Sequence, residues 1–387
     1  MAQDISFGFI STESSQNIKS DWMPLIEDME KQTGLKVKTF FASDYAGIIE
    51  GMRFNKVQLA WMGNKSAMEA VDRSNGEVFA QMVNADGSQG YYSHLIVHKD
   101  SPLNNLNDMF ANSKNLSFGN GDPNSTSGFL VPGFYVFSQN KVDPKTAFKV
   151  VRNANHETNI LAVANKQVDV ATNNSENIEK LKAHQPEKVK EVKIIWTSPL
   201  IPLDPLVMSK NLPEATKAKI KTFFYNYAKT DPREKEIVMK ISKLSGFKAS
   251  TNDQLKPIRQ LDLFGKRNKI EADTTLSDAD KKAKLAEIDQ HLDAHRAWLR
   301  ENYAAGHFLL SGPQRPRTGG FILAAAMERG KLVLKVDGQA PGPGYKDAVF
   351  VPRIYAAAPK DGIYEVDVVA TKPADAGAAA PTPIEIE

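Results

Sequence analysis

The chain has 387 residues, of which 41% are hydrophobic and 25% charged, the proportions of an ordinary globular protein long enough for two or three domains. Its 49 Lys and Arg residues nearly balance 46 Asp and Glu residues, and the net charge of +3 gives no basis for a nucleic-acid partner. Cysteine is absent, which excludes disulfides, thiolate zinc sites and a cysteine nucleophile, and no apolar run approaches the length of a membrane span.

The N-terminal half of the chain alternates short apolar runs with amphipathic segments. Strands are predicted at residues 5–10, 35–41, 57–62, 78–83, 95–97, 116–118, 148–151, 168–171 and 192–196. Helices are predicted at residues 20–34, with Ser20 as the cap, at residues 45–55 and 64–73, and from Ser127 and Glu157 onward. This alternation predicts an α/β fold with largely parallel sheets. No charged and apolar leader precedes the first strand, so an exported precursor is expected to carry a signal peptide absent from this sequence.

Two segments are typical of chain crossings between lobes. One is the polar stretch 86–92, and the other is residues 198–205, where three prolines favour an extended path. The crossings predict a discontinuous first lobe, residues 1–88 and 205–260, and a second lobe, residues 89–204. A ligand site is expected in the cleft between such lobes.

The remainder of the chain is predicted to differ in character. Residues 261–305 read as a helical extension, in which Ser277 and Asp280 form a capping box. Residues 306–387 are rich in Pro, Gly and Ala, with strands expected at 321–326, 332–336 and 364–369. The low-complexity stretch 373–383 is expected to be disordered.

The stretch 119–128, Gly-Asn-Gly-Asp-Pro-Asn-Ser-Thr-Ser-Gly, carries the most informative local pattern. A predicted strand ends in a turn, and Ser125, Thr126 and Ser127 follow where a helix is expected to begin. Free backbone N–H groups and hydroxyls at such a place suit a phosphate-like anion. A capped helix without a ligand is the alternative interpretation, and the Gly-Lys-Ser/Thr element of a Walker loop is missing.

Longer motifs resemble the phosphonate-binding proteins of phosphonate ABC transporters, of the enterobacterial type. The resemblance runs from about residue 5 to about residue 290. Its motifs are residues 41–49, 51–56, 64–73, 119–133, 156–158, 162–173 and 198–202. The resemblance implies the type II periplasmic binding protein fold, with two α/β lobes joined by a two-crossing hinge, and binding of 2-aminoethylphosphonate.

The resemblance also implies which residues bind each end of that ligand. The phosphonate oxygens would be bound by Tyr45, Tyr91, Ser125, Thr126, Ser127 and His156. The amine would be paired by Glu176 and Asp204. Hydroxyl, phenol and imidazole donors suit a phosphonate, and two carboxylates compensate the desolvation of an ammonium. The resemblance further implies a periplasmic location and a membrane permease as partner, with no cofactor, no metal and no catalytic residue.

Each of these residues also has a structural interpretation that the sequence leaves open. Tyr45 could pack against the core, and Tyr91 could serve as a hinge residue. His156 could cap a helix, Glu176 could be a solvated first-turn carboxylate, and Asp204 could stabilise a turn between prolines.

Three positions depart from the expected family pattern. Met62 and Tyr92 stand where Tyr and Trp are expected, and both are expected to alter the wall of the cleft. Leu203 stands where Gly is expected. A glycine beside a ligand carboxylate allows close backbone approach, so the leucine is expected to shift Asp204.

Residues 293–323 resemble the middle of a YciI-like domain, a small α+β protein. His295 in that stretch suggests an enzyme activity, although it also fits an apolar helical stripe with Leu292 and Leu299. A mosaic or engineered phosphonate-sensing fusion is a further hypothesis. Binding without catalysis is the leading one, because the sequence shows no metal constellation, nucleophile–base pair or dinucleotide fingerprint.

Overall fold

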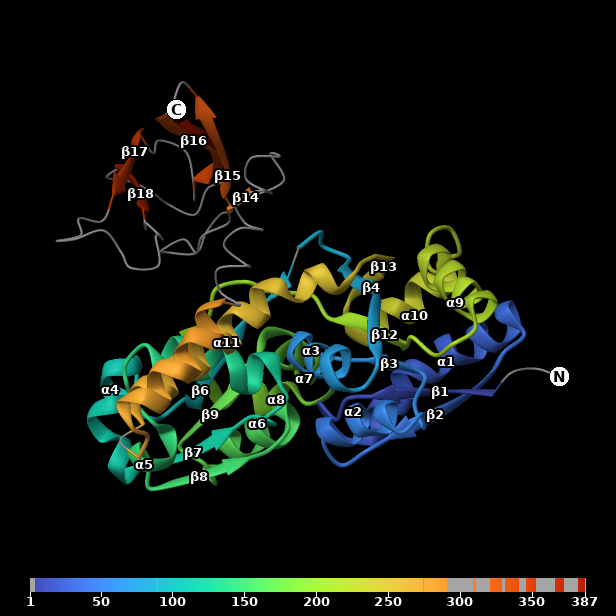
Figure 1. Ribbon diagram of the computed structural model, residues 1–387, viewed down its shortest axis with the longest axis horizontal. Helices are drawn as coiled ribbons and strands as arrows, with labels where there is room; N and C mark the ends of the chain where they lie inside the picture. Colours follow the sequence, from blue (N-terminus) through green and yellow to red (C-terminus); the bar gives the residue numbers. More distant parts are fainter. Residues whose placement is uncertain are drawn as a thin grey trace. The chain divides into compact units, whose positions relative to one another are not determined.

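A computed structural model describes residues 4–290, apart from 89 and 274, and the backbone of the strands β14 to β19 in the rest of the chain. The chain divides into two compact units, residues 1–289 and 290–387. The first unit contains two helix-flanked sheets, with blue and yellow elements in one and teal to green elements in the other (Figure 1).

The first sheet is mixed rather than parallel. Within the described chain it has six strands in the order β13-β4-β12-β3-β1-β2, with bounds β1 (Asp4–Phe9), β2 (Lys36–Phe41), β3 (Leu59–Trp61), β4 (Gly76–Asn84), β12 (Pro205–Ser209) and β13 (Leu244–Ala249). β1 pairs in parallel with β2 and β3, whereas β12 runs antiparallel to both β3 and β4. The expectation of largely parallel sheets is wrong because β12, which follows the second crossing, inserts in the opposite direction.

Helices cover the first sheet and close an aromatic core. They are α1 (Ser15–Thr33), α2 (Tyr45–Arg53), α3 (Asn64–Arg73), α9 (Glu214–Asn226) and α10 (Pro232–Ser242). Phe7 of β1 meets Trp22 of α1 and Phe224 of α9 edge to face, and all three are buried. Ser14 rather than Ser20 caps α1, because its side chain accepts an N–H of the first turn, so the helix begins earlier than predicted.

The second sheet has, within the described residues, five strands in the order β10-β6-β9-β7-β8. They are β6 (Ser93–His98), β7 (Ser117–Asn120), β8 (Val150–Asn153), β9 (Val170–Asn174) and β10 (Val192–Thr197). Around it lie α4 (Leu106–Asn112), η1 (Ser113–Asn115), α5 (Pro144–Ala147), α6 (His156–Ala164), α7 (Ser175–His184) and α8 (Pro186–Lys190). β7 pairs in parallel with β8 and β9, so the segments that follow these strands emerge at one edge.

The segment after β7 does not form the single helix expected from Ser127. Two π-helical turns follow one another instead, η2 (Thr126–Leu130) and η3 (Gly133–Ser138). Pro132 lies between them and has no N–H to donate to the preceding turn, so a regular α-helical ladder cannot run through this segment. Such wide turns are frequent at functional sites.

Two short strands bring the crossings together. β5 (Gly90–Tyr91) pairs antiparallel with β11 (Ile201–Pro202). The chain passes from the first sheet to the second between β4 and β6, and it returns between β10 and β12. Gly90 is packed so closely that a Cβ atom built on it would lie 2.1 Å from the carbonyl oxygen of Ile201.

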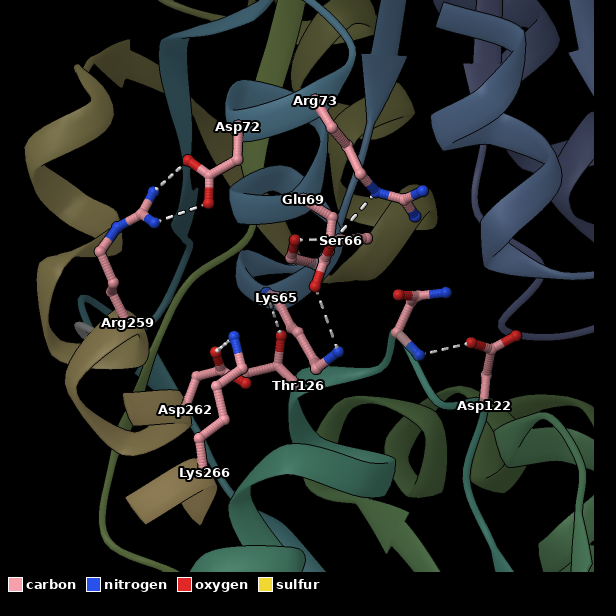
Figure 2. A network of polar contacts seen from close by, with 12 residues as sticks. Lys65, Ser66, Glu69, Asp72, Arg73, Asp122, Thr126, Arg259, Asp262 and Lys266 are labelled. Carbon is pink, nitrogen blue, oxygen red and sulfur yellow. Dashed lines mark hydrogen bonds and ion pairs between the residues drawn. The ribbon is translucent and has the colours of Figure 1, made fainter. Parts of the chain in front are cut away.

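Helix α11 (Lys256–Ala272) follows the short turn η4 (Asn252–Leu255) and begins before the helical extension predicted from residue 261. It contacts elements of both sheets, because Arg259 forms a two-pronged ion pair with Asp72 of α3 while Phe264 packs on Phe134 of η3. The Arg259–Asp72 pair is drawn in Figure 2. Residues 278–290 form a further helix, and Ser277 accepts the N–H of Asp280 as a cap should.

The second unit is described through its strands. They are β14 (Leu309–Leu310), β15 (Phe321–Glu328), β16 (Lys331–Ala340), β17 (Lys346–Pro352), β18 (Val366–Thr371) and β19 (Thr382–Ile386). β15 and β16 form an antiparallel hairpin, and β17 pairs with β18. The predicted strands 321–326 and 332–336 lie within β15 and β16, and 364–369 overlaps β18. His295 and most of the stretch 373–383 lie outside the described residues.

Replacing Gly90 with Ala is expected to destabilise the first unit by about 1–3 kcal/mol, because the added methyl group forces β5 away from β11. Urea unfolding measures the change. Gly265→Ala in α11 is the matched control, since nothing lies within 4 Å of its Cβ position. That change inside a helix is expected to stabilise by about 0.5–1 kcal/mol. Equal unfolding curves for G90A and the wild type would show that the contact between the crossings contributes nothing.

Candidate functional site

A cavity between the two sheets gathers side chains from both of them. Its volume is about 40 Å³, room for a few water molecules or part of a small ligand. Most of the lining residues follow the carboxyl ends of parallel strands, where ligands bind in open α/β sheets. All of the site residues nominated from the sequence line it, namely Tyr45, Tyr91, Ser125, Thr126, Ser127, His156, Glu176 and Asp204.

The loop after β7 presents three buried hydroxyls to the cavity. The Ser125 hydroxyl accepts a hydrogen bond from the N–H of Gly128 at 2.9 Å. The Thr126 hydroxyl accepts one from the N–H of Lys65 at 2.8 Å. The loop is so tight that a Cβ on Gly121 would lie 2.5 Å from the backbone of Gly128, so glycine is required at position 121.

The same loop closes onto the first sheet. Lys65 belongs to the first turn of α3, and Figure 2 shows it beside Thr126. A second contact joins the Asp122 carboxylate to the N–H of Tyr45, at the start of α2, at 3.1 Å. Both bonds connect elements of different sheets, so the two lobes are closed on each other.

His156 is the first residue of α6, and it is buried. Asn155 caps that helix, so the capping interpretation of His156 is wrong. Its Nε2 lies 3.2 Å from the side-chain nitrogen of Asn174 and 3.4 Å from the Ser125 hydroxyl. Burial lowers the pKa of His156 to about 4, so the imidazole is neutral at physiological pH.

Two carboxyl groups line another part of the cavity. Asp204 accepts a hydrogen bond from the Trp61 indole at 3.0 Å, and the Tyr91 hydroxyl lies 3.4 Å from its other oxygen. Glu176 belongs to the first turn of α7 but faces the cavity rather than bulk water. Burial, reinforced by the charge of Asp204, raises the pKa of Glu176 to about 8, and burial raises that of Asp204 to about 7. This pair therefore retains protons near neutral pH.

A lysine that the sequence analysis missed joins the lobes beside Glu176. Lys180 lies one turn farther along α7, and its Nζ is 2.5 Å from Glu13 and 3.0 Å from Asp21. Burial alone would lower the pKa of Lys180, but the two carboxylates outweigh burial and raise it. The spacing of four between Glu176 and Lys180 was the available signal, since it places both on one helix face.

None of the three residues that depart from the family pattern lines the cavity. Met62 is buried in the core of the first sheet, and neither Met62 nor Tyr92 lines the cavity. Leu203 packs in the same core, while Asp204 stays at the cavity through its bond to Trp61. The leucine side chain packs into the core of the first lobe and does not line the cavity, and the shift of Asp204 stays a prediction.

Other kinds of site find no support in the described part of the chain. Within it, no group of three or more His, Asp or Glu side chains is arranged to hold a metal ion. Among the same residues, no helix combines the length and apolar character needed to cross a bilayer. The fold and the cavity define a two-lobed solute-binding protein whose ligand carries an acceptor-rich group.

Comparisons with known proteins agree with this class. The family model described as "ABC transporter, phosphonate, periplasmic substrate-binding protein" matches residues 7–255. The phosphonates-binding periplasmic protein of Escherichia coli K12 is 61% identical over 289 residues, which is 75% of this chain and 85% of that protein. The phosphate-import protein PhnD of Mycolicibacterium smegmatis is 31% identical over 244 residues, 60% of this chain and 75% of that protein.

A solved structure shares the fold of the first unit. It is a binding protein component of an ABC phosphonate transporter from Pseudomonas aeruginosa, with a TM-score of 0.76 and 54% identity over 78% of this chain and 99% of that chain. The chain belongs to the phosphonate ABC transporter family of periplasmic substrate-binding proteins. It is a phosphonate-binding transport component rather than an enzyme, with the two-lobed α/β fold that the sequence predicted.

The C-terminal part carries a second family match. A model of the YCII-related domain matches residues 274–340, so the predicted likeness at 293–323 is confirmed and extends farther in both directions. Membership of the first family implies the periplasm as the place of action and a membrane permease as the partner.

Without ligand, the protein is expected to lose stability as the pH rises from about 5 to 8. The pKa of Glu176 is raised from 4.5 to about 8 in the folded state, so within this range the folded state holds a proton that the unfolded chain has released. Glu176→Gln should flatten the profile, measured by thermal unfolding across the range. Glu179→Gln is the control, because Glu179 lies on the same helix at the surface and its pKa is lowered. Equal slopes for wild type and E176Q would show that Glu176 is ionised in the empty cavity.

Proposed function

We propose that the protein binds 2-aminoethylphosphonate in the cavity between its lobes and delivers it to the permease of an ABC transporter. The observation that carries the proposal is the composition of the cavity lining. It combines hydroxyl donors with two carboxyl groups that burial leaves short of a cation. A zwitterionic ligand with an anionic head and an ammonium matches both kinds of group.

The hydroxyl side fits a phosphonate head. Ser125, Thr126 and Ser127 are each no more than 2% exposed, so their hydroxyls are removed from bulk water and available to a bound ligand. Tyr45 adds a phenol from the opposite lobe, and a side-chain hydrogen bond joins it to Ser125. Hydrogen bonds to a charged acceptor contribute about 1.5–3 kcal/mol each.

The carboxyl side fits an ammonium group. Adding a cation between Glu176 and Asp204 offsets the burial that raises their pKa values, so both should become ionised when the ligand binds. Lys180 does not serve this purpose, because Glu13 and Asp21 already pair it. The ammonium of the ligand would thus provide the positive charge that Glu176 and Asp204 lack.

Inorganic phosphate is the main competing ligand, since one relative is named a phosphate-import protein. Phosphate would satisfy the hydroxyl side but leave the two buried carboxyl groups without a cation. The YciI-like enzyme alternative depends on His295, outside the described residues, and gains no support from the cavity.

The amine assignment predicts a selective loss of affinity. Glu176→Gln and Asp204→Asn are expected to weaken 2-aminoethylphosphonate by about 3–5 kcal/mol and to change methylphosphonate little, because only the first ligand carries an ammonium. Calorimetry with both ligands measures this. Tyr45→Phe is the control, because loss of a phosphonate donor should weaken both ligands alike. Equal losses of the two ligands in E176Q would contradict the amine assignment.

Closure of the lobes is expected to depend on Lys180, whose partners lie on the other lobe. Lys180→Met leaves Glu13 and Asp21 unpaired in the closed form, so the ligand-free protein should shift toward an open form that ligand reverses. The chain has no cysteine, so Lys36→Cys and Lys149→Cys place one spin label on each lobe for distance measurement. Lys182→Met is the control, because Lys182 forms an exposed ion pair with Glu179 on the same helix. Unchanged distance distributions in K180M would exclude a role for Lys180 in closure.

A further inference from the structure

Asn174 touches the site without having been assigned to it. It is the last residue of β9 and the cap of α7, and it is buried. Its side-chain oxygen accepts the N–H of Asn177 at 2.7 Å, which fixes the orientation of the amide. The side-chain nitrogen therefore points the other way, where it lies 3.0 Å from the Ser127 hydroxyl and 3.2 Å from Nε2 of His156.

The orientation of the Asn174 amide determines the positions of two hydrogen atoms, one on the Ser127 hydroxyl and one on the His156 ring. An amide nitrogen only donates, so the oxygen of Ser127 is an acceptor toward Asn174 and its own hydrogen is left to donate elsewhere. For the same reason Nε2 of His156 accepts, and the proton of the neutral ring sits on Nδ1. That Nδ1 is buried and has no partner among the described residues.

The hydroxyl oxygens of Ser125 and Thr126 also accept hydrogen bonds from the protein. Ser125 receives the N–H of Gly128, and Thr126 receives the N–H of Lys65, the contact visible in Figure 2. Each of the three hydroxyl oxygens thus accepts one N–H from the protein. Their hydrogens therefore point toward other acceptors. Side-chain hydrogen bonds join Ser125 to Tyr45 and Ser127 to Tyr91, and a bound phosphonate would take the place of these neutral partners.

We propose that Asn174 is a positioning residue that keeps the Ser127 hydroxyl as a donor, and that the protein thereby selects the doubly ionised form of a phosphonate. A dianionic phosphonate has only acceptors, which match a set of donors. A monoanion carries a P–OH hydrogen that would face another donor and stay unpaired, which costs affinity. This inference rests on the phosphonate side of the proposed function and not on the amine.

Tyr45, Tyr91 and His156 do not supply this selection. Burial raises the pKa values of Tyr45 and Tyr91, so both phenols stay protonated. His156 remains neutral above about pH 4. The charged and acidic groups around the cavity are Lys65, Asp122, Glu13, Lys180, Glu176 and Asp204, and all of them are identical in the variants compared below.

The test is the pH profile of methylphosphonate affinity, because this ligand has no amine and its second ionisation falls near neutral pH, as that of a phosphoryl group does. Glu176 and Asp204 ionise in the same range and would repel a dianion, so all profiles are measured in the Glu176→Gln, Asp204→Asn double variant. There, affinity should rise about tenfold per pH unit below the ionisation of the ligand and then level off. Asn174→Asp keeps an oxygen to cap α7 but accepts from Ser127, which turns the Ser127 oxygen toward the ligand as an acceptor. The rise should then become flat or reverse.

Two further variants separate hydrogen-bond polarity from charge and from folding. Asn155→Asp adds the same charge at the cap of α6, next to His156, without touching Ser127, and should keep the slope of the double variant. Asn174→Ser retains a capping oxygen but cannot reach Ser127, so it should lose about tenfold of the affinity at high pH and less at low pH. Asn174→Ser tests the inference if Asn174→Asp does not fold.

The possible outcomes distinguish this inference from the amine assignment. A flat profile in the Glu176→Gln, Asp204→Asn background, or a profile with N174D as steep as that with N155D, would overturn the inference while leaving the amine assignment standing. Loss of selectivity for the amine in E176Q with an intact pH slope for methylphosphonate would support both. Failure of the wild type to bind methylphosphonate at every pH would overturn this inference together with the phosphonate side of the proposed function.

Discussion

The closed form depends on one constraint, which is that polar groups removed from water between the lobes must find partners on the opposite lobe. Lys180 of the second lobe meets Glu13 and Asp21 of the first, the Asp122 carboxylate meets the N–H of Tyr45, and Thr126 meets the N–H of Lys65. A buried charge without such a partner is strongly destabilising. Because each pair spans the cleft, all of these interactions form together when the lobes close.

The carboxyl pair Glu176 and Asp204 is the exception to this constraint. Trp61 and Tyr91 approach Asp204, but neither carries a positive charge, and Lys180 is engaged by other carboxylates. The pair responds by holding protons, which is how a buried acid avoids an unpaired charge. Glu176 and Asp204 thus lack a cationic partner at the place where the ammonium of a ligand would bind. A binding site gains specificity from such groups, because only a ligand with the matching charge can pair with them.

Much of this arrangement could be predicted from the sequence, and the omissions have physical causes. The turn at 119–128, the three hydroxyls after it and the two crossings are local patterns, and the structure shows each of them where it was predicted. The start of α1 at Ser15 was missed because several Ser residues nearby compete as caps. The pairing of Lys180 with Glu13 was missed because it joins residues far apart in the chain, and neither residue type signals a partner on its own.

The absence of a cation at the hydroxyl side has a consequence for release. Among the cavity-lining residues of the described chain, Lys180 and His156 are the basic groups, and the first is paired with carboxylates while the second is neutral. A dianion would therefore be bound by neutral donors contributed from both lobes, with Tyr45 on one side and the loop at 125–127 on the other. When the lobes separate, the ligand loses part of its donors at once. Tight binding when closed and ready release when open then follow from the same set of hydroxyls.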